Sequence, residues 1–92
     1  MIKYFTNCFL ATKVSFSNEI KQICEKIDVD YDKVVEYALY DKRLGRSHLS
    51  VPGPDGKNGF GGSCFPKDLN ALIKVAEELN TEPKVLKSVW EK

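Results

Sequence analysis

The stretch "NGFGGSCFPKDLNAL", residues 58–72, joins a glycine-rich turn to an apolar helical pattern and carries a cysteine at the junction. Pro66 suits the first position of a helix, because a proline has no N–H group to pair and the first helical N–H groups have no partner. After it, apolar residues recur at the three- and four-residue steps of an amphipathic helix: Leu69, Leu72, Ile73, Ala76 and Leu79. The stretch predicts a helix that begins beside a reactive type of side chain.

Three further helices are predicted around it. From residue 2 onward the apolar positions recur mostly at helical steps, with no capping residue before them: Ile2, Phe5, Phe9, Phe16, Ile20, Ile23 and Ile27. Asp28 and Asp30 interrupt this pattern, and Asp30 suits the cap of a second helix with apolar positions Tyr31, Val34, Val35, Ala38 and Leu39. Thr81 and Pro83 begin a last helix with apolar positions Val85, Leu86, Val89 and Trp90. We expect an all-α fold of about four helices.

Between Leu44 and Gly62 the helical periodicity disappears into glycines and prolines, which is the composition of an irregular loop rather than of strands. No strand-like alternation of useful length occurs elsewhere. Structureless loops of this length are uncommon in small domains and often carry function. We therefore expect the glycine-rich loop, residues 45–62, to belong to the functional site.

Composition limits the classes of protein that fit. The 92 residues suffice for one small domain, 1–92, and the net charge of +1 gives no reason to expect nucleic acid or a membrane surface as partner. No apolar run is long enough to span a bilayer and no secretory signal opens the chain, so we expect a cytoplasmic protein. Three cysteines without a CxxC pair support neither a disulfide framework nor a zinc site.

Cys64 is the first candidate for chemistry. A thiolate is stabilised by a helix N-terminus and by a nearby cation, and the sequence offers both, with Lys67 as the cation. Asp68 would lie in the first turn, where it could polarise water or a hydroxyl group. The alternative is a small cysteine packed beneath the loop, with Lys67 and Asp68 as a solvated helix start.

Other polar residues allow two interpretations as well. Lys3 and Asn7 are four residues apart and share a helix face, where two donors could hold an oxyanion or a water. From these residues alone, ordinary surface positions are the favoured alternative. Three basic residues lie at the mouth of the loop, where they could meet a phosphate or simply be solvated: Arg43, Arg46 and His48. Cys8 and Cys24 lie within the first helical pattern and are expected in the core. The glycines are not a dinucleotide fingerprint, because Cys64 stands where the last glycine would be and no strand precedes them.

Four segments taken together suggest a family. "KYFTN" (3–7), "FSNEI" (16–20), "DKRLG" (41–45) and "GFGGSCFPKD" (59–68) occur in this order, and the chain resembles the central, helical, dimer-forming domain of the UDP-glucose 6-dehydrogenase family of nucleotide-sugar dehydrogenases. The resemblance covers essentially the whole chain. It implies a dimeric enzyme that uses NAD, bound by a separate Rossmann domain, and a C-terminal domain that binds the nucleotide. Neither of these domains is in the 92 residues, so we expect a fragment that is inactive alone.

The resemblance also implies roles for single residues. Cys64 matches the nucleophile that attacks the C6 aldehyde, and Lys3 and Asn7 match the pair that stabilises the oxyanion and positions water. Asp68 matches the aspartate that assists proton transfer. The substrate would be bound by the loop residues and two cations: Gly59, Phe60, Gly61, Gly62, Lys67 and Arg43, with Arg43 reaching across the dimer to the nucleotide sugar.

Three points stay open at this stage. The segment "SVPGPDGKN" (50–58) looks longer than in many members of the family, which leaves the docking of the loop undecided. The resemblance favours UDP-glucose, oxidised to UDP-glucuronate, as the substrate, with GDP-mannose or another nucleotide sugar as the alternative. A helical dimerisation module without catalysis is the alternative function, and we expect any dimer contact to run along Phe16, Ile20 and Ile23.

Overall fold

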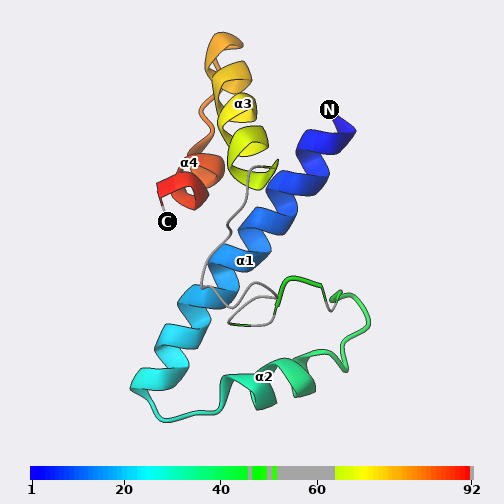
Figure 1. Cartoon of the computed structure of the whole chain (residues 1–92), viewed down its shortest axis with the longest axis vertical. Coiled ribbons are helices and arrows are strands. Elements are labelled where there is room, and N and C mark those ends of the chain that lie inside the picture. Colours follow the sequence, from blue (N-terminus) through cyan, green and yellow to red (C-terminus); the bar gives the residue numbers. More distant parts are fainter. Residues whose placement is uncertain (46, 50, 52–63, 92) are drawn as a thin grey trace.

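The computed structural model describes residues 1–45, 47–49, 51 and 64–91, except the side chains of residues 64 and 65. The described residues form four helices and no strand: α1 (Ile2–Lys26), α2 (Tyr31–Ala38), α3 (Cys64–Glu78) and α4 (Lys84–Glu91). The expected all-α class is therefore confirmed. Figure 1 shows α1 as a diagonal axis, with α3 and α4 beside its N-terminal part and α2 beside its C-terminal end.

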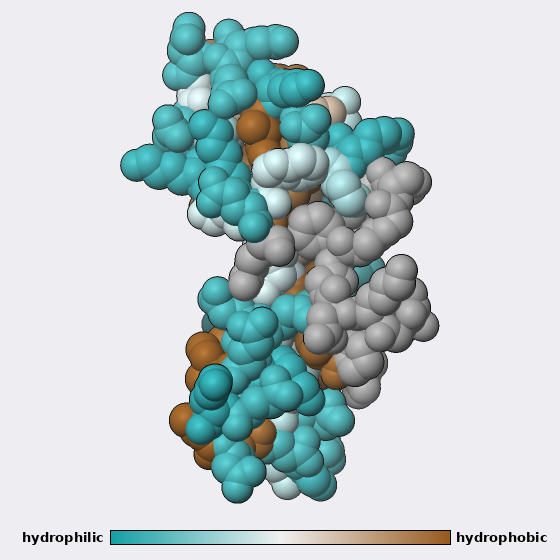
Figure 2. Space-filling view, turned by 60° about the vertical axis from the view of Figure 1, so that its left-hand side comes forward, coloured by the Kyte–Doolittle hydropathy of each residue, from teal (hydrophilic) through white to brown (hydrophobic). Residues whose placement is uncertain are grey.

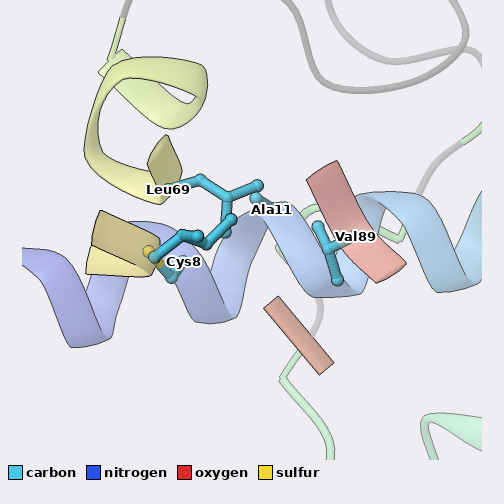
Figure 3. Close-up of a cluster of buried hydrophobic side chains, with 5 residues drawn as sticks. Cys8, Ala11, Leu69 and Val89 are labelled. Carbon is cyan, nitrogen blue, oxygen red and sulfur yellow. The ribbon is translucent and has the colours of Figure 1, made fainter. Parts of the chain in front are cut away.

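The main core lies where α1, α3 and α4 meet. Its buried members are Cys8 and Ala11 from α1, Leu69 and Ile73 from α3, and Val89 from α4. Figure 3 shows Cys8, Ala11, Leu69 and Val89 converging from the three helices. Ala11 and Leu69 have no exposed surface, because the small alanine lets the α3 leucine approach the α1 backbone closely. This contact fixes how α3 lies on α1.

A second, smaller core lies at the other end of α1. Cys24, Tyr31 and Val51 are buried there, and the Tyr31 hydroxyl donates a 2.6 Å hydrogen bond to the Leu49 carbonyl oxygen. The chain after α2 is thereby attached to the α1–α2 corner. The prediction that Cys8 and Cys24 are core residues is confirmed, since both are buried.

The helix ends follow the expected signals with one correction. The Asp30 carboxylate accepts from the Asp32 backbone N–H and caps α2, as predicted. Helix α3 begins at Cys64, two residues before the predicted start at Pro66. A proline fits anywhere in the first turn, because the N–H groups of that turn have no intrahelical partner. Cys64 is thus part of the first turn of α3 and does not precede the helix.

Several apolar residues predicted on helix stripes are not in the core. Leu79 lies after the end of α3 and is 69% exposed, since Asn80 takes a positive φ of 60° and turns the chain away from the helix. On α1 the apolar stripe from Ile2 to Ile27 is largely exposed, whereas the small residues Cys8, Ala11, Ser15 and Ser17 are buried. The structure places α3 and α4 against small residues and leaves large apolar ones in contact with solvent.

Truncating Leu69 tests whether this core fixes the fold. We expect Leu69→Ala to lower the free energy of unfolding by about 2–5 kcal/mol, because it opens a cavity at a side chain with no exposed surface. The same truncation at exposed Leu79 is the matched control and should cost less than about 1 kcal/mol. Urea unfolding followed by circular dichroism measures both, and equal losses would contradict this description of the core.

Candidate active site

One hydrogen bond joins the two halves of the candidate site. The Asn7 side-chain amide on α1 donates through Nδ2 to Asp68 Oδ2 on α3 at 2.7 Å, across 61 residues of sequence. Asp68 is 1% exposed and Asn7 is half-buried. The next residue on each helix, Cys8 and Leu69, belongs to the main core. The core that packs α3 on α1 therefore also brings this amide and this carboxylate together.

Two further predicted residues lie one helical turn from the bonded pair. Lys3 is four residues before Asn7 on α1 and is exposed. Cys64 is four residues before Asp68 and is the first residue of α3. The N–H groups of a first helical turn lack intrahelical partners and favour a negative charge, so this is a position that stabilises a thiolate.

The buried Asp68 also affects its neighbour Cys8. Burial raises the pKa of the Cys8 thiol, and the Asp68 charge raises it further. Cys8 therefore stays a neutral thiol at physiological pH and is a packing residue. The two cysteines of this region thus hold different positions, since Cys64 is the first residue of α3 and Cys8 is in the core beside a carboxylate.

Arg43 lies apart from the Asn7–Asp68 pair. It follows α2 and lines a cavity of about 390 Å³ between α1 and α2, together with residues such as Phe9, Lys13 and Tyr31. Its side chain is 89% exposed and makes an ion pair with Asp41 at 2.6 Å. Two hydrogen bonds from the Arg43 side chain and one from its backbone N–H lower the pKa of the Asp41 carboxyl group. Asp41 had no role in the sequence analysis, although the D-x-R spacing of "DKRLG" was available as a signal.

Of the remaining candidate residues, the structure describes Lys67 but not the loop residues. Lys67 is exposed on the first turn of α3. The predicted loop residues Gly59, Phe60, Gly61 and Gly62 lie outside the described residues. Within the described ranges, no group of three or more potential metal ligands occurs and no helix is long and apolar enough to cross a membrane. The described helices also form no βαβ unit that could bind a dinucleotide.

Comparison with known proteins identifies the family. The family model for the central domain of the UDP-glucose/GDP-mannose dehydrogenase family matches residues 1–92. The chain belongs to this family. It is 48% identical over 89 residues to the UDP-glucose 6-dehydrogenase YwqF of Bacillus subtilis, and 46% identical over 89 residues to a UDP-glucose 6-dehydrogenase of Rickettsia typhi. In each case the match covers 97% of this chain and 19% of the relative.

A solved structure supports the fold of this central domain. A UDP-glucose dehydrogenase from the hyperthermophilic archaeon Pyrobaculum islandicum superposes with a TM-score of 0.86 at 41% sequence identity. The match covers 98% of this chain and 20% of that one. The chain thus spans about a fifth of the length of the relatives it matches.

Replacing the Asn7 amide by a carboxylate tests whether Asn7 and Asp68 are hydrogen-bonded. Asn7→Asp places a second carboxylate beside buried Asp68, so the two groups would hold a proton at a higher pH than free carboxyl groups do. A carboxyl pKa raised in the folded state costs stability as the pH rises above the unfolded value of about 4. We expect Asn7→Asp to lose about 1–3 kcal/mol of unfolding free energy at pH 7 and much less at pH 4.5.

The control is the exchanged pair. Asn7→Asp combined with Asp68→Asn restores one amide and one carboxylate and should recover most of the loss at pH 7. Urea unfolding at the two pH values measures all three proteins. A loss in Asn7→Asp that is independent of pH, or a double variant without recovery, would contradict the hydrogen bond between these side chains.

Proposed function

We propose that this chain is the central, catalytic-cysteine domain of an NAD-dependent UDP-glucose 6-dehydrogenase that oxidises UDP-glucose to UDP-glucuronate. The observation that carries the proposal is the hydrogen bond between Asn7 and Asp68, one helical turn from Lys3 and Cys64 respectively. Two relatives that match nearly the whole chain are named UDP-glucose 6-dehydrogenases, which supports UDP-glucose as substrate. GDP-mannose and other nucleotide sugars are the alternative substrates.

Covalent catalysis by Cys64 divides the four-electron oxidation into simpler steps. After the first oxidation of C6 to an aldehyde, the Cys64 thiolate adds to the carbonyl carbon and the carbonyl oxygen becomes an oxyanion. Loss of a hydride from C6 of this thiohemiacetal leaves a thioester. Water then adds to the thioester carbon, the C–S bond breaks, and the products are the uronate carboxylate, the Cys64 thiolate and the two protons of the water.

The helix pair supplies the groups that assist these steps. Lys3 and the Asn7 amide stabilise the oxyanion as donors, and Asn7 also positions the water. Asp68, held by Asn7 at 2.7 Å, accepts a proton from that water during hydrolysis. The loop residues Gly59, Phe60, Gly61 and Gly62 and the exposed Lys67 contact the sugar nucleotide in this proposal.

NAD supplies the acceptor for both hydrides. The described helices do not fit this cofactor, since they offer no strand–turn–helix unit with a glycine fingerprint. We assign its binding to another part of the enzyme, in keeping with the 19% of the relatives' length that this chain matches. The 92 residues alone should therefore not turn over.

A homodimer completes the site in this proposal. Of the residues predicted at the dimer contact, Phe16 and Ile23 are exposed, whereas Ile20 is partly buried against the second core. Ile2, Phe9, Phe16 and Ile23 are seven residues apart along α1, and each is at least half exposed, with Ile23 the least at 50%. A seven-residue apolar repeat is the pattern by which two helices pack along their length. Figure 2 shows apolar surface around the lower end of the molecule, where α1 ends and α2 lies. Arg43 would reach from one subunit to the nucleotide sugar bound by the other.

The catalytic proposal is tested by counting NADH. The segment, joined to the domains that flank it in its genome, should form two NADH per UDP-glucose, and Cys64→Ser should abolish or stall the reaction because a hydroxyl group is a far weaker nucleophile than a thiolate. Cys24→Ser is the matched control at a buried cysteine remote from the site. If the enzyme oxidises another nucleotide sugar and not UDP-glucose, the mechanism stands and the substrate assignment is wrong. If it oxidises no nucleotide sugar, the domain is a non-catalytic helical module.

The dimer is tested by mass in solution. Sedimentation equilibrium of the chain should give twice the monomer mass of 10.4 kDa, and Phe16→Glu should yield monomers, because it places a charge within the exposed apolar stripe. Lys26→Glu, a charge change at the exposed end of the same helix, should leave the dimer intact. A monomeric parent at high protein concentration would overturn this contact.

A further inference from the structure

We propose that Asp41 is a positioning residue that fixes the Arg43 guanidinium for an anionic substrate group, with Lys13 holding the same segment on α1. The inference rests on the proposed function, in which Arg43 binds the nucleotide sugar. It adds two residues, Asp41 and Lys13, to the substrate-binding arrangement. Both were absent from the candidate residues of the sequence analysis.

The Asp41 carboxylate contacts Arg43 at three donors. Arg43 Nε donates to Oδ1 at 3.0 Å and Arg43 Nη2 donates to Oδ2 at 2.6 Å, which is a bidentate pair. The Arg43 backbone N–H also donates to Oδ1 at 3.0 Å. The carboxylate therefore holds both the backbone and the guanidinium of the same residue, and the plane of the guanidinium follows the plane of the carboxylate.

This arrangement leaves donors for a ligand. A guanidinium has five N–H donors, and the bonds to Asp41 use its Nε edge. The Nη1 group lies on the edge that does not face Asp41, and the Arg43 side chain is 89% exposed. A fixed, planar pair of donors on an accessible edge suits the oxygen atoms of a phosphate group.

Lys13 fixes the other end of the segment. Its Nζ donates to the Gly45 carbonyl oxygen at 3.1 Å, so the chain from Asp41 to Gly45 is attached to α1 two residues beyond Arg43. Lys13 and Arg43 both line the α1–α2 cavity. Without these contacts, an exposed arginine would lose more side-chain entropy when it binds a ligand. Asp41 and Lys13 order it beforehand.

The activity test separates positioning from simple charge. In the enzyme joined to its flanking domains, Asp41→Ala should raise KM for the nucleotide sugar roughly three- to fivefold and leave kcat unchanged. Glu36→Ala is the matched control, because it removes another exposed carboxylate that pairs with a cation, and should leave KM unchanged. If only the loss of a negative charge mattered, both variants would lower KM for the anionic substrate, and that result would contradict a positioning role for Asp41.

A double-mutant cycle tests whether Asp41 acts through Arg43. Arg43→Ala alone should raise KM, and adding Asp41→Ala should raise it no further. Lys13→Met should raise KM in the same direction as Asp41→Ala. Additive effects of Asp41→Ala and Arg43→Ala, or an unchanged KM in Asp41→Ala with an active parent, would overturn the inference and leave the proposed function intact.

A measurement on the chain itself does not depend on activity. The sequence has two arginines, Arg43 and Arg46, so Arg43→Lys assigns the two Nε–H signals in a ¹⁵N NMR spectrum. The Arg43 Nε order parameter should be about 0.8 and should fall below about 0.6 in Asp41→Ala. A low value in the parent would overturn the inference. A parent that oxidises no nucleotide sugar would overturn the proposed function. The order parameter would still show whether Asp41 fixes the Arg43 guanidinium.

Discussion

The packing of Leu69 against Ala11 is the constraint on which the candidate site depends. Both side chains lack exposed surface, so a shift of α3 from its register on α1 would disrupt their packing. This register places Asp68 beside Asn7, because each is next in sequence to a member of the same core, Leu69 and Cys8. A buried carboxylate is costly without a partner, and the Asn7 amide supplies that partner. Stability and the geometry of the site are therefore linked in this domain.

The candidate residues fall into two places rather than one. Asn7 and Asp68 meet at the α1–α3 contact, whereas Arg43 lies by the α1–α2 cavity and is held by Asp41. If both places act on one substrate, as we propose, a second copy of the chain is the simplest way to bring them together. The large apolar residues of α1 that are exposed among the described residues, including Phe9 and Phe16, fit that requirement.

The sequence predicted the helices well, and its errors have physical causes. Helical periodicity located the four helices of the described residues, and the Asp30 cap was predicted correctly because an N-cap needs only local residues. Periodicity could not tell a buried apolar face from an exposed one, so the exposed stripe of α1 resembled a core pattern. It also could not show that Asn7 meets Asp68 or that Asp41 holds Arg43, because tertiary packing and side-chain geometry decide these contacts. The roles of Lys3, Cys64 and the loop glycines remain predictions.

The most direct test of the account is to find the covalent intermediate. The complete enzyme would be mixed with UDP-glucose and NAD, quenched rapidly in acid, digested, and analysed by peptide mass spectrometry, with Asn7→Ala used to slow hydrolysis of the thioester. The account predicts a sugar adduct on the peptide that contains Cys64, in larger amount in the Asn7→Ala variant than in the parent. No adduct in either protein while NADH still forms, or an adduct on the peptide of Cys8 or Cys24, would contradict it.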